Sequence, residues 1–352
     1  MRRVLVVRLD GAGDVLLAGP AVRAVAAGSD VTMLCGPDGA AAARLLPGVT
    51  DVLTWASPWV LADPPPVRAV DLDRLVARLA DWRFAEAVVL TSFHQSPLPT
   101  ALVLRLAGVA RITGASVDYP GSLLDVRLRP GEDLSEDIPE PERMTAIAAA
   151  AGYPVLDDGR LAVRPPPAVG DLVPDGRYVV LHPGAAAPAR TWPTEHATRA
   201  AALLAAEGWR VVVTGGSGER GLTAAVAGSA GTDLGGRTDL AQLSGVLAGA
   251  AAVVVGNTGA AHLAAAVGTP VVSLFAPVVP AVRWRPYRVP QVLLGDQHAP
   301  CRDTRARDCP VPGHPCLSTV EPEDVRDAVR RLRGLPPPPP SLLSLSPSEG
   351  TP

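Results

Sequence analysis

Small and polar residues follow several apolar segments of this sequence, and the most informative of these loops lies within residues 253–277. A β-branched run leads into the loop 256–259, Gly-Asn-Thr-Gly, and then into an Ala-rich helical segment that contains His262. Such a loop leaves backbone N–H groups at the helix start unpaired, and these favour an anion. Asn257 and Thr258 can cap the helix and still donate to a ligand. We therefore predict a phosphate-sized site at the carboxyl end of a parallel strand, with His262 either beside the phosphate or in a structural role.

Two further loops follow apolar runs in the same half of the chain. Residues 182–193 present one guanidinium, Arg190, which can hold phosphate oxygens through two parallel hydrogen bonds. A solvated arginine in a surface loop is the competing interpretation. Residues 214–219 form a Gly-rich turn in which Gly215 allows close backbone approach and Glu219 can accept from ribose hydroxyls. For Glu219, spacing alone favours an acid in the first turn of a helix.

A candidate general base follows the first apolar run. Residues 8–14, Arg-Leu-Asp-Gly-Ala-Gly-Asp, predict a tight turn with Asp14 at or near the start of a helix. Taken alone, the position favours a helix N-cap, and the alternative is a carboxylate that removes a proton. A dinucleotide fingerprint is disfavoured because Leu16 occupies the place of the third glycine.

The last group of reactive side chains is Cys-rich. It consists of His298, Cys301, Cys309, His314 and Cys316. The segment is Pro-rich and has no CxxC pair, so we favour buried thiols over a zinc site and predict no metal.

These loops need a scaffold, and the order of elements predicts one. Strands are expected at residues 4–7, 31–34, 87–90, 178–181, 210–213 and 253–255, and helices around 20–27, 196–207, 240–248 and 260–268. Alternating strands and helices indicate parallel sheets, so the small loops of the second half should line up on one sheet edge. Residues 57–70 are expected to form a loop. We predict two α/β doubly wound domains facing a cleft, with domain two binding a nucleotide-like anion.

Domain boundaries follow from prolines and periodicity. We expect a first domain at 1–164, a Pro-rich linker at 165–175, a second domain at 176–320, an amphipathic helix at 321–333 and a disordered Pro/Ser-rich tail at 334–352.

Bulk properties exclude several classes of function. The 352 residues allow two domains, and a net charge of −3 gives no global basic field for nucleic acid. The start becomes polar too quickly for a signal peptide, and no apolar run is long enough to span a membrane. Four Cys in a chain of this length do not make a disulfide scaffold, so we expect a cytoplasmic protein.

Together the segments around residues 8–25, 182–193, 214–219 and 256–277 resemble glycosyltransferase family 9, which includes the ADP-heptose:lipopolysaccharide heptosyltransferases. The resemblance extends over about residues 1–333. It implies a glycosyltransferase fold of the B type, with two Rossmann-like domains of which the first binds the acceptor and the second the sugar nucleotide. It also implies that the helix at 321–333 crosses back to the first domain.

The resemblance also assigns roles to residues. Asp14 would be the catalytic base, and Arg190 would contact the donor phosphates. The loop with Asn257, Thr258, Gly259 and His262 would hold the diphosphate. The position of Asn257 is commonly Asp in the family, and Asn keeps the shape and hydrogen bonding of that residue but loses its charge.

The expected reaction is transfer of a heptose-like sugar, with inversion, from an ADP-linked donor to a hydroxyl of a cell-envelope glycan or glycolipid. The sugar nucleotide is a co-substrate and no cofactor is required. A peripheral contact with the inner membrane surface is expected. The alternative is a non-catalytic sugar-nucleotide or glycan-binding protein on the same scaffold, motivated by Asn257. A dehydrogenase is the third possibility, and the missing third glycine disfavours it.

Overall fold

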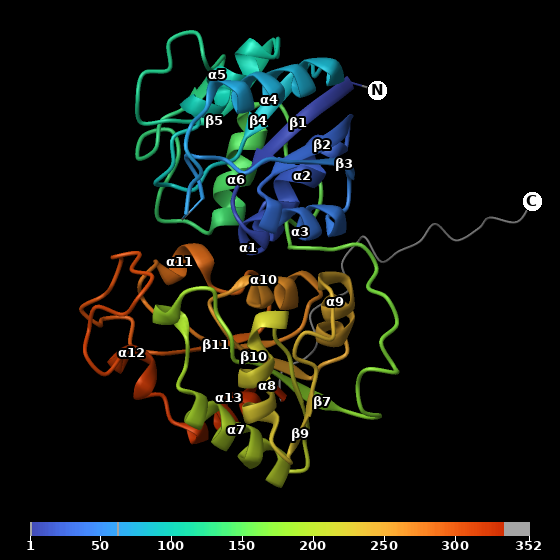
Figure 1. The fold of residues 1–352 in the computed structure, drawn as a ribbon, viewed down its shortest axis with the longest axis vertical. Helices are drawn as coiled ribbons and strands as arrows, with labels where there is room; N and C mark the ends of the chain where they lie inside the picture. The colour runs from blue at the N-terminus through green and yellow to red at the C-terminus, as the bar shows by residue number, and fades with distance from the viewer. Residues whose placement is uncertain (1, 62, 334–352) are drawn as a thin grey trace, which may run out of the picture. The chain divides into compact units, whose positions relative to one another are not determined.

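The computed structural model describes residues 2–61 and 63–333. The chain divides into two compact units, and the boundary falls between Arg164 and Pro165. Residues 165–175, the expected linker, contain neither helix nor strand. The tail expected to be disordered, 334–352, lies outside the described residues. Each unit can be followed by colour in Figure 1, unit 1 from blue to green and unit 2 from green through yellow to red.

Unit 1 is a parallel sheet with helices on both faces. Its six strands lie in the order β3-β2-β1-β4-β5-β6, so the chain moves outward from β1 in one direction and then in the other. The elements are β1 (Arg2–Arg8), α1 (Ala12–Leu17), α2 (Gly19–Ala26), β2 (Ser29–Cys35), η1 (Pro37–Gly39), α3 (Ala40–Leu45), β3 (Val49–Thr54), α4 (Ala69–Trp82), β4 (Glu86–Val89), α5 (Leu98–Leu106), β5 (Arg111–Ala115), β6 (Val126–Leu128) and α6 (Glu140–Ala150).

Unit 2 repeats this plan. Its six parallel strands lie in the order β12-β11-β10-β7-β8-β9. The elements are β7 (Tyr178–His182), η2 (Pro188–Arg190), α7 (Thr194–Ala206), β8 (Arg210–Val213), η3 (Ser217–Glu219), α8 (Arg220–Ala227), β9 (Gly231–Asp233), α9 (Leu240–Ala248), β10 (Ala252–Gly256), α10 (Gly259–Ala266), β11 (Val271–Leu274), α11 (Ala281–Trp284), β12 (Gln291–Leu294), α12 (Pro315–Ser318) and α13 (Pro322–Arg333).

Alternation along the central strands explains why both faces of each sheet are covered. In β1, Leu5 and Val7 pack with α4 and α5, whereas the intervening Val4 and Val6 are equally buried. Side chains alternate between the faces of a strand, so an unbroken apolar run needs helices on both sides. The strands therefore read as continuous Val/Leu runs, as expected for parallel sheets.

The helix at the end of the described chain belongs to unit 2 by its contacts. The sequence resemblance implied a helix at 321–333 that crosses back to the first domain. In the structure α13 packs against α7 and against β10, β11 and β12, with Val325, Val329 and Leu332 in the unit 2 core. Of the helices in the described residues, none combines the length and apolarity needed to cross a membrane.

Candidate functional site

In unit 1, Asp14 lies on the carboxyl side of the central strand β1. Ligands of open α/β sheets bind where the chain direction changes, as it does between β1 and β4. Gly11 is the N-cap of α1, and Asp14 is the third helical residue, so the interpretation of Asp14 as the N-cap is wrong. The Asp14 side chain is 30% exposed, and its Oδ1 accepts a hydrogen bond of 2.8 Å from Arg8 Nη2.

Arg8 begins the predicted segment 8–14, but it had no predicted role of its own. Its side chain is fully buried, and it forms ion pairs with Asp10 at 3.0 Å, Asp14 at 2.8 Å and Glu140 at 3.8 Å. Burial lowers the pKa of Arg8, but the attraction of these three carboxylates outweighs it and raises that pKa. A buried guanidinium with paired carboxylates is stable where an unpaired one would not be. The available signal was a charge at the end of the apolar run of β1.

The loop after β4 completes the surroundings of Arg8. Arg8 Nη2 donates to Ser92 Oγ at 2.8 Å, and Gln95 Nε2 donates to Asp10 Oδ1 at 2.6 Å. Gln95 Oε1 in turn accepts from the Ser92 N–H at 3.0 Å. Burial raises the pKa of Asp10, and the charge of Arg8 partly offsets this. Glu140, on helix α6, also pairs with Arg8, and no local sequence pattern near Arg8 predicts this contact.

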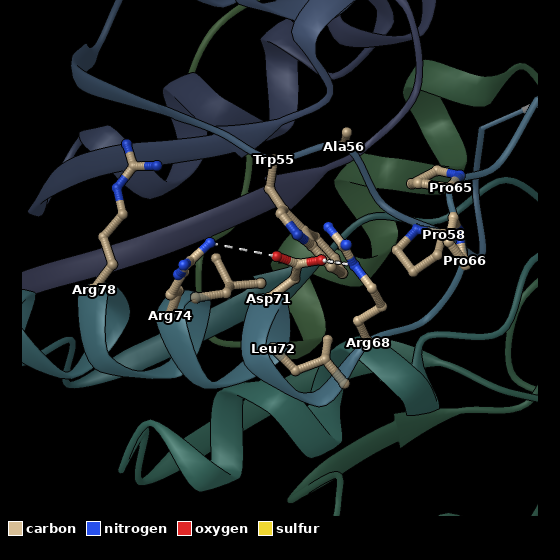
Figure 2. A pocket seen from close by; sticks show the side chains of 11 residues that line it. Trp55, Ala56, Pro58, Pro65, Pro66, Arg68, Asp71, Leu72, Arg74 and Arg78 are labelled. Atoms are coloured by element: carbon tan, nitrogen blue, oxygen red, sulfur yellow. Dashed lines mark hydrogen bonds and ion pairs between the residues drawn. The ribbon is translucent and has the colours of Figure 1, made fainter.

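A pocket of about 350 Å³ opens after β3 in the same unit. Figure 2 shows its lining side chains: Trp55, Ala56, Pro58, Pro65, Pro66, Arg68, Asp71, Leu72, Arg74, Leu75 and Arg78. The sequence predicted a loop over residues 57–70, and α4 in fact begins at Ala69. The spacing of three to four residues along α4 therefore turns several charged side chains toward one pocket.

The charge and shape of this pocket suit an anionic ring compound. Arg68 pairs with Asp71 at 2.8 Å and Arg74 with the same carboxylate at 3.7 Å, while Arg78 Nη1 donates to the Thr54 carbonyl at 3.2 Å. Three guanidinium groups against one carboxylate leave an excess of positive charge. Trp55 supplies an aromatic surface, stabilised by edge contact with Trp59 at a centroid distance of 4.8 Å.

In unit 2, the three small loops lie on one sheet edge. β7 pairs with both β10 and β8, all in parallel, so the loops that follow these strands are neighbours. This confirms the expectation drawn from the order of elements. The loops contain, in chain order, Arg190, then Gly215 and Glu219, then Asn257, Thr258 and Gly259.

Arg190 ends the short helix η2 and lies against the loop after β10. Its Nη1 makes a long contact of 3.5 Å with the Asn257 carbonyl, and a Cβ at Gly256 would lie 2.9 Å from the Arg190 carbonyl oxygen. The side chain is partly buried, which disfavours the interpretation of a solvated surface arginine. Ala189 is fixed from the other side, because its N–H donates to the Arg307 carbonyl and its carbonyl contacts His314 Nε2.

The start of α10 carries unsatisfied polar atoms. Asn257 is 4% exposed, and neither its side-chain oxygen nor its nitrogen has a hydrogen-bond partner within the described residues. Thr258 is the N-cap residue, but its buried Oγ1 caps no backbone N–H and has no partner in the same part of the chain. A buried polar group without a partner costs about 1–3 kcal/mol. The side chains of Asn257 and Thr258 are two such groups beside a helix N-terminus, and together they indicate a place for a ligand. His262 is buried within α10.

Glu219 lies in the turn after β8, and His182 is the last residue of β7. The Glu219 carboxylate accepts a 2.6 Å hydrogen bond from the Gly216 N–H, so the acid at a helix start favoured by spacing is confirmed. A Cβ at Gly215 would lie 2.6 Å from Thr223 Cγ2, which explains the glycine. His182 Nδ1 lies 3.0 Å from Thr214 Oγ1. Burial lowers the pKa of His182, against the opposing effect of Glu219. His182 begins the predicted loop segment 182–193 but had no predicted role of its own.

Three of the four cysteines, Cys301, Cys309 and Cys316, form part of the unit 2 core. Cys301 and Cys316 are buried, Cys309 is partly buried, and none is in a disulfide. Burial, followed by the nearby Cys301 and Cys309, raises the pKa of Cys316 to about 12. In the described ranges, no group of three or more His, Cys, Asp or Glu side chains is arranged to hold a metal ion.

The two sequence comparisons both find heptosyltransferases. Residues 147–314 match the sequence model described as glycosyltransferase family 9 (heptosyltransferase). Lipopolysaccharide heptosyltransferase 1 of Pseudomonas aeruginosa is 33% identical over 143 residues, which is 40% of this chain and 40% of that protein. The aligned stretch thus spans less than half of this relative.

Solved structures match nearly the whole chain. The E. coli ADP-heptose LPS heptosyltransferase II superposes with a TM-score of 0.71 at 20% identity, over 95% of this chain and 98% of that one. The E. coli heptosyltransferase WaaC with ADP gives a TM-score of 0.65 at 21% identity, over 94% and 97%. At such identities the likeness establishes the fold, and it confirms the two-domain glycosyltransferase fold of the B type. Residues 147–314 are similar to the family 9 model, and over that segment the resemblance recognised in the sequence is confirmed.

Proposed function

We propose that this protein is an inverting glycosyltransferase that moves a heptose-like sugar from an ADP-linked donor to a hydroxyl of a cell-envelope glycan or glycolipid. The observation that carries the proposal is the buried amide of Asn257 at the start of α10, without partners in the described residues and beside Arg190. Hydrogen-bond donors at a helix N-terminus favour an anion, and a diphosphate is such an anion. The family 9 match of this segment supports a sugar nucleotide as that ligand.

Unit 2 would hold the donor and stabilise the leaving group. As the bond between the anomeric carbon and the diphosphate breaks, negative charge grows on the departing phosphate oxygens. Arg190 and the first N–H groups of α10 would stabilise this charge, since preorganised donors act most strongly where charge develops. Glu219 would accept hydrogen bonds from ribose hydroxyls. These groups would replace a metal ion in the reaction, and the sugar nucleotide is the co-substrate.

Unit 1 would supply the base. Asp14 takes the proton of the acceptor hydroxyl while that oxygen forms the new bond to the anomeric carbon and the nucleoside diphosphate leaves. General base catalysis of this kind contributes about 10²–10⁴-fold. The partial exposure of the Asp14 carboxylate allows a substrate hydroxyl to reach it.

The pocket after β3 would bind the acceptor. Its three arginines and the Trp55 ring suit a saccharide that carries carboxylate or phosphate groups. The proposal places the reaction in the cytoplasm, with a peripheral contact to the inner membrane surface where a glycolipid acceptor would lie.

The test is release of ADP when purified protein receives ADP-heptose and a panel of acidic glycan acceptors. Wild-type protein should release ADP. The Asp14→Asn variant should release it at a rate lower by about 10²-fold or more, with an unchanged melting temperature. Full activity of a folded Asp14→Asn protein would remove Asp14 from the mechanism.

A non-catalytic sugar-nucleotide-binding protein is the second candidate, because Asn257 lacks the charge common at this position in the family. It predicts calorimetric binding of ADP-heptose without any release of ADP in the presence of every acceptor tested.

A further inference from the structure

We propose that Arg8 is the positioning residue of Asp14: it fixes the carboxylate of the base while Asp10, Ser92 and Gln95 fix Arg8 itself. The proposal rests on the proposed function, in which Asp14 is the base, and it adds a residue that neither the sequence resemblance nor the comparisons assign. Arg8 is buried and does not touch substrate in this mechanism, so its effect must act through Asp14.

Arg8 is held by contacts that do not involve Asp14. A ring of contacts starts with the ion pair between Arg8 Nε and Asp10 Oδ2 at 3.0 Å and with the hydrogen bond that Gln95 Nε2 donates to Asp10 Oδ1 at 2.6 Å. It continues from Gln95 Oε1 to the Ser92 N–H at 3.0 Å, and from Ser92 Oγ back to Arg8 Nη2 at 2.8 Å. Because the guanidinium is planar and its donors have a fixed geometry, such a ring determines its orientation.

Of the three carboxylates paired with Arg8, that of Asp14 is the most exposed. Asp14 is 30% exposed, whereas the side chains of Asp10 and Glu140 are 14% and 0% exposed. The bond from Nη2 therefore fixes one oxygen of a carboxylate that solvent and substrate can still reach. A misplacement of about 1 Å in a catalytic group can cost about 10²-fold in rate, so this orientation matters.

Arg8 lies within a group of charged side chains. Arg8 on β1 pairs with Asp10 in the following loop, with Asp14 and with Glu140 on α6, and Arg143 on α6 pairs with Glu136. The attraction that stabilises the charge of Arg8 also favours the ionised form of Asp14. Asp10 and Glu140 share the same cation.

The experiment is a double-mutant cycle of Arg8→Gln and Asp14→Asn, with Arg23→Gln as the matched control. Arg23 is also a largely buried arginine paired with an aspartate, Asp157 at 2.6 Å, and its Nη2 donates to the Arg160 carbonyl. We expect Arg8→Gln to lower kcat about 10-fold to 10²-fold with the donor KM unchanged. In the Asp14→Asn background the same change should cost less than about twofold. Arg23→Gln should lower the melting temperature and leave kcat unaltered.

Two results would overturn the proposal: an equal cost of Arg8→Gln in both backgrounds, or a rise in KM with kcat unchanged. If Arg8→Gln does not fold, Ser92→Ala replaces it, since it removes one bond to Nη2 and should lower kcat only while Asp14 is present.

A readout without turnover separates this proposal from the proposed function. The carboxyl ¹³C resonance of Asp14, assigned with Asp14→Asn, is followed by NMR against pH. Loss of the Arg8 charge should move its titration to higher pH by about 1–3 units, whereas Arg23→Gln should leave it in place. Absence of any sugar transfer by wild-type protein defeats the proposed function. An unmoved titration defeats the role of Arg8.

Discussion

The Glu219 carboxylate fills the space that a side chain at position 184 would need, because a Cβ added to Gly184 would overlap its oxygens. The loop after β7 and the turn after β8 are thereby fitted to each other through one glycine and one flexible acid. The contact lies at the edge where the donor nucleoside would bind. It makes Gly184 a test of the Glu219 assignment that leaves Glu219 itself in place.

Gly184→Ala should push the Glu219 carboxylate aside at little cost in stability, since the obstacle is the end of a flexible side chain. Loss of its hydrogen bonds to ribose should weaken ADP binding about 10-fold to 10²-fold, as for a hydrogen bond to a charged group. Calorimetry with ADP measures this. Gly218→Ala is the control, because a Cβ there would meet nothing within 4 Å. Equal ADP affinity of the two variants would show that Glu219 does not touch the nucleoside.

Arg190→Ala should weaken ADP binding by about 10-fold to 10²-fold, because a charge-assisted contact to phosphate is lost. Arg190→Lys should recover part of it, since lysine keeps the charge without the paired donors. Affinity for adenosine, which has no phosphate, should not change. Arg237→Ala, an exposed arginine after β9, serves as the control. A similar loss for adenosine would mean that Arg190 supports the fold of the loop and not the phosphates.

The stability of the protein should fall with acid because of His182. Burial, against the effect of Glu219, keeps the pKa of His182 below its ordinary value of 6.5. The unfolded chain therefore takes up the proton first, so the stability contributed by neutral His182 is present above about pH 6.5 and lost as the pH falls below it. Urea unfolding at pH 8, 7, 6 and 5 measures the slope. His182→Gln should flatten it, and the same change at exposed His298 should not. An identical slope in both variants would contradict this account.

The pocket after β3, proposed to bind the acceptor, can be tested through its arginines. Arg68→Ala with Arg74→Ala should raise the KM for an acidic acceptor and leave kcat and the donor KM unchanged. Stability should hardly change, because exposed pairs such as those with Asp71 contribute about 0–1 kcal/mol. Quenching of Trp55 fluorescence by the acidic saccharide gives an independent binding signal. Arg199→Ala on α7 is the control. An equal effect on a neutral acceptor would rule out recognition by charge.

The fold and the donor loops were predictable because their signals are local. Residues 210–213 and 240–248 coincide with β8 and α9, since β-branched runs and Gly or Asp boundaries specify short elements directly. The alignment of Arg190, Glu219 and Asn257 on one edge also followed, because parallel strands place their following loops together.

The surroundings of Asp14 were not predictable in this way. Glu140 reaches Arg8 from α6, far along the chain, and no local pattern connects the two. The N-cap interpretation failed because Gly11 already occupies the cap, which the spacing of Asp14 could not reveal. The pocket after β3 is lined by Trp55 and by residues of α4, a helix that begins soon after the Pro-rich run at 64–66. Long-range pairing of charges therefore had to come from the structure.

Asn257 separates ligand binding from stability. If its amide is kept for a ligand, Asn257→Leu should stabilise the ligand-free protein, because a buried polar group without partners in the described chain is replaced by an apolar one of similar size. The expected gain is about 1–3 kcal/mol in the free energy of unfolding, measured with urea. ADP affinity should fall at the same time by about 10-fold or more, since the donors to the diphosphate are gone. Ala260→Ser, at a buried position of the same helix turn, is the control and should not produce this pair of opposite changes. A variant that loses both stability and affinity would show that Asn257 holds the loop together instead of awaiting the donor.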